Sequence, residues 1–456
     1  MISRLLILGG SGDLTARYLM PALAELQAGG QLPEGLRVTG VGRDEWDDER
    51  FGEFAAEALR RHAPAHVGGS HDALLAALSW RTADVTDADR LGRLVGESDE
   101  PVVVYLALPP AVFAPVVDAL CRIRLPSGSV LVVEKPFGTD LDSARDLNER
   151  LSALLPEEAV FRLDHVLAKQ TVQNILGLRF ANRVFEPIWS HAHVSQVDIV
   201  WDETLALEGR AGYYDRAGAL RDMVQNHLLQ LLALVAMEPP TGMGQRDLRE
   251  RKVDVLRATR ALTSDETDHP SVRARYTAGE LGGAQVPDYT SEEGVDPRRG
   301  TETFTEATLA VDNWRWAGTL FTLRTGKALA GDRTEIVLRF HEVPHRVFPV
   351  DTAPEANTLR LRLGPDQIRL RVNLNTSEDL FTLEPGELAL SLAPPQLSAY
   401  ARLLLDILHR DATLSIRGDE AEESWRIVQP ILDSWARDEV PLATYPAGSS
   451  GPGSSP

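Results

Sequence analysis

Residues 4–14 are Arg4-Leu5-Leu6-Ile7-Leu8-Gly9-Gly10-Ser11-Gly12-Asp13-Leu14, a short apolar run that leads directly into closely spaced glycines. The apolar run is typical of a buried strand, and the residues from Leu14 to Gln27 have the periodicity of a helix. A dinucleotide-binding fold places its pyrophosphate at such a turn, because glycines let the backbone approach the phosphates and the helix N-terminus favours their charge. The spacing departs from Gly-x-Gly-x-x-Gly, so the turn alone is equally compatible with an ordinary strand-to-helix connection.

The alternation of strand and helix continues to about residue 165, which indicates parallel βαβ units and an α/β N-terminal Rossmann domain. A further helix is expected at Ala111–Arg122. The expected strands are Arg4–Leu8, Arg37–Val41, Trp80–Ala83, Val102–Ala107 and Ser129–Val133.

After about residue 170 the pattern changes to helices at Thr171–Phe180 and Ala219–Met237, with a strand at Val194–Trp201 between them. Strands with hairpin-like spacing follow, which predicts a C-terminal α+β domain with a large, mainly antiparallel sheet. These strands are Thr305–Val311, Thr334–Phe340, Thr358–Leu363 and Gln367–Leu374, and two amphipathic segments, Pro395–His409 and Glu420–Arg437, come after them.

These patterns divide the chain into an N-terminal domain at 1–165, a C-terminal domain at 166–446, and a tail at 447–456. The tail is rich in Gly, Ser and Pro, and we expect it to be disordered because it has little apolar surface to bury. A length of 456 residues fits two domains with separate cores.

Charge and cysteine content narrow the class of protein. A net charge of −20 argues against a nucleic-acid binder, which needs surplus Lys and Arg. The single Cys121 cannot form an intramolecular disulfide, and the apolar run at the N-terminus is too short to span a membrane. We therefore expect a cytoplasmic protein with no membrane or nucleic-acid partner.

The end of the second expected strand bears on the choice of cofactor. An acidic residue there binds the ribose 2′-hydroxyl of NAD, whereas a basic residue accommodates the 2′-phosphate of NADP. Arg43 occupies this place and favours NADP, while the adjacent Asp44 is compatible with NAD as a secondary cofactor.

Three further segments are similar to the sequence blocks of glucose-6-phosphate dehydrogenases, in the order of that family. They are Glu134-Lys135-Pro136-Phe137-Gly138, Arg162-Leu163-Asp164-His165-Val166-Leu167-Ala168-Lys169 and Arg221-Asp222-Met223-Val224-Gln225-Asn226-His227-Leu228-Leu229-Gln230. The resemblance implies oxidation of C1 of D-glucose 6-phosphate to 6-phospho-D-glucono-1,5-lactone with reduction of NADP, the first step of the pentose phosphate pathway. It also implies that the domain at 1–165 binds NADP and that the domain at 166–446 serves substrate binding and oligomerisation. A homo-oligomer, either a dimer or a tetramer, and a cis bond between Lys135 and Pro136 are further implications.

The resemblance carries over roles for individual residues. His227 matches the catalytic base, Asp164 the carboxylate that orients it, and Lys169 a lysine between the phosphate and the reacting end. The substrate-binding positions are His165, Lys169, Lys135, Glu203, Asp222 and Lys327. The cofactor-binding positions are Gly9, Ser11, Gly12, Asp13, Leu14, Arg43 and Lys135. No metal site is expected, because His191 and His193 lack an apparent third ligand.

Helical geometry gives two further expectations. In an α-helix Asp222 lies five positions before His227 and therefore roughly 140° around the axis, which places the two poorly for pairing. His165 and Lys169 are four apart and would share one face of a helix following Asp164. Without the resemblance, Asp164 is equally well explained as a helix N-cap, His227 as a satisfied core histidine, and the other charged positions as surface residues.

The sequence departs from the family in the substrate pocket. Val166 stands where the family has a tyrosine that donates to the phosphate, and Gly364 stands where many relatives carry a glutamine. These departures leave open a paralogue that acts on a different hexose phosphate or sugar derivative. A catalytically weak regulatory partner of an active relative is a third hypothesis. The joint presence of the residues expected for proton transfer weighs against it, namely Asp164, Lys169, Asp222 and His227.

Overall fold

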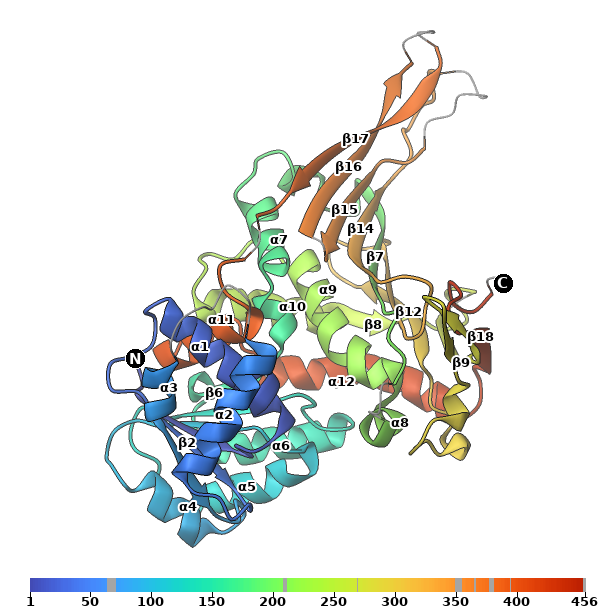
Figure 1. Cartoon of the computed structure of the whole chain (residues 1–456). Coiled ribbons are helices and arrows are strands. Elements are labelled where there is room, and N and C mark those ends of the chain that lie inside the picture. The colour runs from blue at the N-terminus through green and yellow to red at the C-terminus, as the bar shows by residue number, and fades with distance from the viewer. Residues whose placement is uncertain are drawn as a thin grey trace. The chain divides into compact units, whose positions relative to one another are not determined.

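The computed structural model describes residues 1–63, 71–207, 211–268, 270–348, 355–364, 366–376, 381–393 and 395–453. The chain forms two compact units. Unit 1 consists of Met1–Lys169, Pro240–Arg249 and Pro395–Glu422, and unit 2 consists of Gln170–Pro239, Glu250–Pro394 and Glu423–Pro456. Figure 1 labels many of their helices and strands.

Unit 1 contains a six-stranded parallel sheet in the order β3-β2-β1-β4-β5-β6. Its strands are β1 (Arg4–Leu8), β2 (Arg37–Gly42), β3 (Leu78–Thr82), β4 (Val103–Leu106), β5 (Val130–Glu134) and β6 (Val160–Leu163). The strands β1, β4, β5 and β6 are buried along almost their whole length, as expected where helices cover both faces of a parallel sheet. The prediction of a Rossmann-type α/β domain is confirmed.

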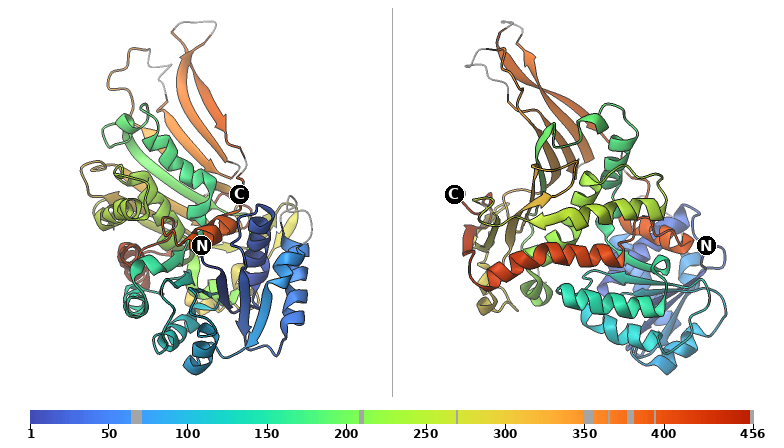
Figure 2. Two further views of the ribbon diagram at one scale, coloured as in Figure 1. Left: turned by 90° about the vertical axis from the view of Figure 1, so that its left-hand side faces the viewer. Right: turned by 180° about the vertical axis from the view of Figure 1, so that it is seen from behind.

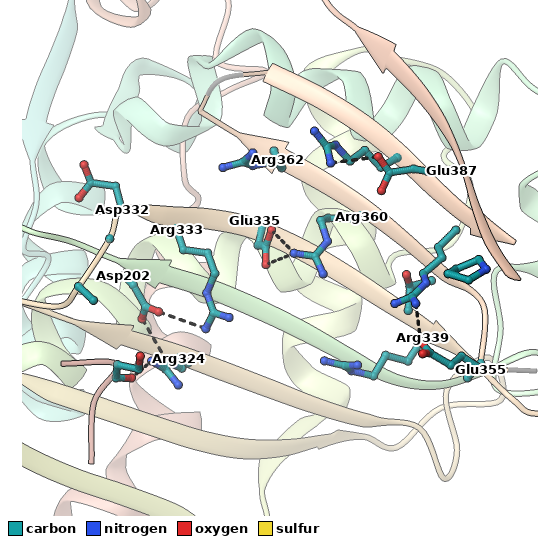
Figure 3. Close-up of a pocket in the computed structure, with 18 of the residues that line it drawn as sticks. Asp202, Arg324, Asp332, Arg333, Glu335, Arg339, Glu355, Arg360, Arg362 and Glu387 are labelled. Carbon is teal, nitrogen blue, oxygen red and sulfur yellow. Dashed lines mark hydrogen bonds and ion pairs between the residues drawn. The ribbon is translucent and has the colours of Figure 1, made fainter. Parts of the chain in front are cut away.

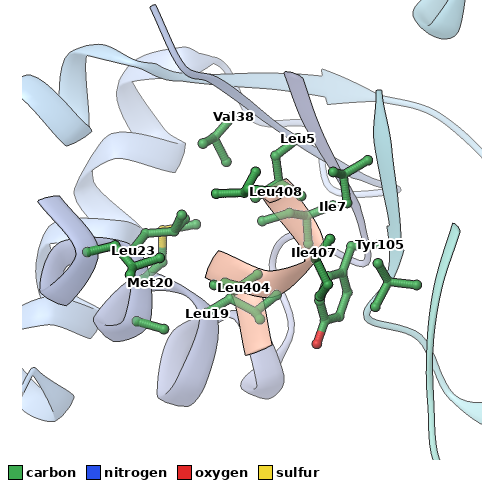
Figure 4. Packing of buried hydrophobic residues seen from close by; sticks show 14 of the residues in the cluster. Leu5, Ile7, Leu19, Met20, Leu23, Val38, Tyr105, Leu404, Ile407 and Leu408 are labelled. Atoms are coloured by element: carbon green, nitrogen blue, oxygen red, sulfur yellow. The ribbon is translucent and has the colours of Figure 1, made fainter. Parts of the chain in front are cut away.

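The helices of unit 1 include one from late in the chain. The run η1 (Thr15–Leu19) and α1 (Met20–Ala28) follows β1, and the others are α2 (Asp48–His62), α3 (Asp72–Ala76), α4 (Ala88–Val95), α5 (Phe113–Leu120), α6 (Leu141–Leu154) and α11 (Ala399–His409). Figure 4 shows Leu404, Ile407 and Leu408 of α11 between side chains of β1 and of the η1–α1 helix. The apolar face of α11 therefore belongs to the hydrophobic core of unit 1. This unit thus includes residues far beyond 165, where the sequence patterns suggested that the first domain ends.

Unit 2 is built on a ten-stranded, mostly antiparallel sheet, which confirms the expected fold class. The order is β17-β16-β15-β14-β7-β13-β12-β9-β18, with β8 paired to β12. The strands are β7 (Val194–Asp202), β8 (Thr259–Ala261), β9 (Ser271–Thr277), β12 (Phe304–Val311), β13 (Leu320–Gly326), β14 (Arg333–Phe340), β15 (Thr358–Leu363), β16 (Asp366–Asn375), β17 (Leu383–Ser391) and β18 (Leu442–Pro446). A separate hairpin joins β10 (Gly279–Leu281) to β11 (Ala284–Val286).

Two neighbours in this sheet, β7 and β13, run parallel, with Gly326 opposite Asp202 at their carboxyl ends. The helices of unit 2 are α7 (Gln170–Phe180), α8 (Ala211–Ala219), η6 (Leu220–Leu228) and α9 (Leu229–Ala236), together with most of α10 (Gln245–Ala258) and α12 (Gly418–Ala436). The right-hand view of Figure 2 shows α12 along its length. No helix of the described residues is long and apolar enough to cross a membrane.

Strand β6 was missing from the sequence prediction because its short apolar run is interrupted by Arg162. The Arg162 side chain is 1% exposed. Its guanidinium donates to Glu157 Oε1 at 3.0 Å and to Asn148 Oδ1 at 2.9 Å. These partners, which come from other elements, compensate for the burial of a charged arginine in a strand, and sequence periodicity does not reveal them.

The chain end also differs from the expectation of disorder, at least for residues 447–453. The Ala447 amide donates to the Thr277 carbonyl at 3.1 Å, and the Gly448 amide donates to the Ala328 carbonyl at 2.8 Å. The Ser450 carbonyl accepts from Arg324 at 2.8 Å. Strand β18 leads this segment along unit 2, and its backbone groups find partners there even though it has few apolar side chains. Residues 454–456 lie outside the described part of the chain.

Candidate active site

The glycine loop after β1 fits a bound pyrophosphate. Gly9 has φ +91°, and a Cβ there would lie 2.2 Å from the Ala107 carbonyl oxygen, so no other residue is accommodated. Gly12 donates its amide to the Gly9 carbonyl at 3.0 Å, which closes the turn at the start of the helix. The loop thus presents backbone rather than side chains at the carboxyl end of β1, as a dinucleotide site requires.

Other predicted cofactor residues surround this loop in unit 1. The Ser11 hydroxyl donates to Asp44 Oδ2 at 2.6 Å, and Arg43 is exposed at the end of β2. Asp13 is exposed and forms an ion pair with Arg17 at 2.9 Å. Leu14 packs against the core of unit 1. Ser11, Arg43 and Asp44 therefore lie at the carboxyl ends of the strands β1 and β2, and the glycine loop holds Asp44 through the Ser11 hydroxyl.

Lys135, Asp164 and His165 follow the carboxyl ends of β5 and β6. The bond between Lys135 and Pro136 is cis, as the resemblance implied. Asp164 is 1% exposed, and its Oδ1 accepts from the Val166 amide at 2.9 Å, so it caps the following turn. The structure thus confirms the N-cap role that the sequence alone allowed, and this role does not depend on whether Asp164 also orients a catalytic base.

The segment after Asp164 does not form the helix expected from the His165–Lys169 spacing. His165–Ala168 is a short 3-10 helix, and Lys169 is extended at its end with ψ 132°. The expectation that His165 and Lys169 share one helical face is therefore wrong, because the helix stops before Lys169. Val166, at the position of the family tyrosine, is fully buried.

Two tyrosines near these residues could not be predicted from the sequence. The Tyr105 hydroxyl donates to Glu134 Oε1 at 2.5 Å, and Tyr400 of α11 also hydrogen-bonds this carboxylate. Burial raises the pKa of Glu134 to about 7, against the opposing effects of Tyr105 and Lys135. The Tyr400 ring stacks on His165 with centroids 5.9 Å apart. Since Tyr400 lies about 235 positions after His165, only the packing of α11 into unit 1 reveals the contact.

In unit 2 the candidate site lies at the carboxyl ends of β7 and β13. Glu203 follows β7 and Lys327 follows β13, and their side chains form an ion pair of 2.6 Å. The two backbones are joined as well, because the Glu203 amide donates to the Gly326 carbonyl at 2.8 Å. Lys327 also lies 5.2 Å from the ring centroid of Tyr214. Because the carboxyl ends of adjacent parallel strands lie at the same edge of a sheet, the two strands bring these predicted substrate residues together.

His227 and Asp222 lie on η6, beside the same strand ends. The His227 ring stacks on Trp201 of β7, with centroids 6.0 Å apart, and is 3% exposed. Tyr213 lies with its hydroxyl 3.5 Å from Asp222 Oδ1, and burial, followed by this carboxylate, raises the pKa of Tyr213. The expected 140° separation of Asp222 and His227 is wrong, because η6 is a π-helix rather than an α-helix.

A large groove in unit 2 lies on the sheet face that Figure 3 shows, with helices behind the strands. Its volume is about 1090 Å³, and it is lined by alternating arginines and carboxylates. Arg333 pairs with Asp202 at 3.1 Å, and Arg360 pairs with Glu335 at 2.9 Å. None of the predicted site residues is among the described residues that line this groove. Gly364 lies in the exposed turn between β15 and β16.

Two family models together match the chain almost from end to end. Residues 6–174 match the NAD binding domain of glucose-6-phosphate dehydrogenase, and residues 176–456 match its C-terminal domain. The chain belongs to the glucose-6-phosphate dehydrogenase family. The nucleotide loop of unit 1 lies in the first match, and the strand ends that carry Glu203 and Lys327 lie in the second.

Individual members of the glucose-6-phosphate dehydrogenase family are similar along their whole length. Glucose-6-phosphate 1-dehydrogenase of Rhizobium meliloti (strain 1021) is 39% identical, over 98% of this chain and 94% of the relative. The enzyme of that name from Mycolicibacterium smegmatis is 40% identical, over 98% and 93%. A solved glucose-6-phosphate dehydrogenase in complex with its substrate glucose-6-phosphate superposes with a TM-score of 0.89 at 30% identity, over 99% of this chain and 96% of the other.

Proposed function

We propose that the chain is an NADP-dependent glucose-6-phosphate 1-dehydrogenase, which oxidises C1 of D-glucose 6-phosphate to 6-phospho-D-glucono-1,5-lactone. One observation carries the proposal beyond family membership. The Glu203–Lys327 pair and the helix that bears Asp222 and His227 lie at the same strand ends of unit 2. A hydroxyl-rich, anionic substrate needs such a mixture of carboxylates, a cation and a base.

His227 acts as the general base in this proposal. It takes the proton of the C1 hydroxyl while a hydride leaves C1, so the hemiacetal becomes a lactone and no atom is left over. The nicotinamide cofactor, when bound, accepts the hydride. Imidazole suits the task because its ordinary pKa lies near neutrality. The family resemblance assigns Asp164 to the orientation of the His227 imidazole, as a carboxylate does in hydrolase triads.

Substrate binding divides between charged residues with different roles. Lys135, His165 and Lys169 supply the positive charge that a phosphate monoester requires, and the stacking of Tyr400 on the His165 ring limits the ring's orientations. Asp222 and Glu203 accept hydrogen bonds from sugar hydroxyls, and Lys327 holds Glu203 in place through the 2.6 Å ion pair.

The preference for NADP rests on the end of β2. Arg43 is exposed there and available to a 2′-phosphate, whereas Asp44 accepts the Ser11 hydroxyl at 2.6 Å and is thereby held against the glycine loop. The fit of the loop to a pyrophosphate supports the remaining contacts of Gly9, Gly12, Asp13 and Leu14. We expect NAD to serve as a weaker, secondary cofactor, and the enzyme to act in the cytoplasm as a homodimer or homotetramer.

A steady-state assay tests this proposal. Glucose 6-phosphate, glucose, fructose 6-phosphate, glucosamine 6-phosphate and 2-deoxyglucose 6-phosphate are compared at saturating NADP and then NAD, by absorbance of the reduced nucleotide. The proposal predicts the highest kcat/KM for glucose 6-phosphate with NADP. A higher value for another sugar phosphate would favour the paralogue hypothesis. That hypothesis rests partly on Val166, which is buried at the position of the family tyrosine.

A further inference from the structure

The helix that bears Asp222 and His227 has an uncommon hydrogen-bond pattern. Residues Leu220–Leu228 form a π-helix. At its end the Leu229 amide donates to the Val224 carbonyl five positions earlier and to the Asn226 carbonyl three positions earlier. Such helices are rare and usually extend over a single turn, often at functional sites. Nine residues of this geometry therefore need a local cause.

The π-helical pattern changes which side chains share a face. Where hydrogen bonds join residues five apart, those residues lie one above the other, as residues four apart do in an α-helix. Asp222 and His227 are five apart and so lie on one face of η6. An α-helix over the same residues would turn the Asp222 carboxylate roughly 140° away.

Two buried side chains, those of Glu302 and Asn226, hydrogen-bond to the backbone of η6. At the start, Glu302 Oε1 accepts from the Leu220 amide at 2.9 Å, and the Glu302 carbonyl accepts from the Ala219 amide at 3.1 Å. The chain enters η6 through Gly218, at φ +70°, where a Cβ would lie 2.4 Å from the Glu302 carboxylate. A side-chain oxygen that accepts from an amide at a helix N-terminus satisfies a group with no partner inside the helix, and this one sets where the helix begins.

Next to His227, the Asn226 side chain satisfies two backbone groups within the turn. Its Nδ2 donates to the Arg221 carbonyl, five positions earlier, at 3.0 Å. Its Oδ1 accepts from the His227 amide at 2.7 Å. Asn226 is 4% exposed, so these bonds form away from solvent. A backbone pattern that is otherwise unfavourable is thus completed by a side chain beside the base.

We propose that Glu302 and Asn226 are positioning residues, which hold η6 in the π-helical form and thereby place Asp222 and His227 on one face toward the sugar. This inference rests on the proposed function for the roles of Asp222 and His227. The positions of Glu302 and Asn226 in the hydrogen-bond pattern do not depend on that function, which allows the two to be tested separately.

Kinetics of single variants test the effect on catalysis. Glu302→Ala and Asn226→Ala should each lower kcat/KM for glucose 6-phosphate by roughly 10- to 100-fold, on the scale of a misplaced reacting group. Glu302→Gln keeps an oxygen for the Leu220 amide and should stay within about fivefold of wild type. Glu293→Ala, which removes an exposed carboxylate of unit 2, is the matched control. The Kd for NADP should be unchanged in all four, since the nucleotide residues belong to unit 1.

A double-mutant cycle separates positioning from general stabilisation. If Glu302 acts through Asp222, then Glu302→Ala should cost much less in an Asp222→Asn background than in wild type, and the combined loss should fall well below the product. A residue that only stabilises the fold lowers activity independently of Asp222. Fully multiplicative losses would therefore contradict the proposal.

Crystal structures of Glu302→Ala and Asn226→Ala without substrate measure the helix itself. The expected result is a shift of residues 220–228 toward hydrogen bonds four residues apart, with Asp222 turned away from the face of His227. Retention of the π-helical pattern in both variants would overturn the proposal. A wild-type enzyme inactive on every sugar phosphate would refute the proposed function instead, and the helix geometry of the variants would still decide this inference.

Discussion

The nucleotide loop of unit 1 and the strand ends of unit 2 both lie at the carboxyl ends of parallel strands, but the chain assembles them in different ways. The loop is made from residues adjacent in sequence, and its central element is the backbone of Gly9–Gly12. The site in unit 2 joins Glu203 to Lys327, which are 124 positions apart, across one parallel pair of a mostly antiparallel sheet.

This difference explains how each site would respond to substitution. A loop made of backbone tolerates little change at its glycines, while its cofactor preference rests on exposed side chains at its rim. The site in unit 2 depends on pairs of buried or half-buried side chains, each of which leaves a charged partner behind when it is removed.

The largest effect is expected at the base in unit 2. His227→Asn should lower kcat by roughly 10²–10⁴, the usual contribution of general-base catalysis, while glucose 6-phosphate still binds. Stopped-flow and steady-state measurement of NADPH formation give kcat, and equilibrium binding of substrate gives the control. Retention of more than about a tenth of the wild-type kcat would show that His227 is not the base.

The ion pair in unit 2 should matter next. Lys327→Met leaves the Glu203 carboxylate half-buried without its 2.6 Å partner. We expect kcat/KM for glucose 6-phosphate to fall roughly 100-fold, mainly through KM, as for loss of a charge-assisted bond. The matched control is Arg369→Met, which removes a cation from the arginine-lined groove. Equal losses in the two variants would contradict a specific role for Lys327.

At the rim of the nucleotide loop the effect should be selective rather than general. Arg43→Ala should weaken NADP by about 1.5–3 kcal/mol, the contribution of a charge-assisted hydrogen bond, and leave NAD nearly unchanged. Arg50→Ala, on the exposed face of α2, is the control. The ratio of KM values for the two cofactors measures this effect, and an equal loss for both would assign Arg43 a structural role.

The smallest effect concerns stability in unit 1. Burial raises the pKa of Glu134 to about 7, so the folded state binds its proton more tightly than the unfolded state does. The contribution to the free energy of unfolding is therefore greatest below about pH 4.5 and is lost as the pH rises through about 7. Glu134→Gln should flatten this decline by on the order of 2 kcal/mol.

Urea unfolding between pH 5 and 8 measures the Glu134 effect, with Glu158→Gln as an exposed control on the same unit. A variant curve parallel to that of wild type would mean that Glu134 does not titrate in this range.

Sequence patterns predicted those elements whose structure is determined by residues close to one another in the chain. The strands of unit 1 follow from apolar runs and the glycine loop from its turn, whereas β6 was hidden by Arg162, whose partners come from other elements. The packing of α11 into unit 1 and the Tyr400–His165 stack depend on contacts between distant segments.

The helical periodicity around His227 correctly predicted a helix, but it could not distinguish a π-helix from an α-helix. That distinction depends on Glu302, about 75 positions later in the chain.

In the proposed reaction a hydride passes from C1 of glucose 6-phosphate to NADP. Glucose 6-phosphate deuterated at C1, followed by mass spectrometry of the NADPH and of the sugar product, measures this transfer. We expect one deuterium in every NADPH formed and a 6-phosphogluconolactone that hydrolyses to the acid. Unlabelled NADPH, or reduction of NADP without loss of the C1 deuterium, would contradict it.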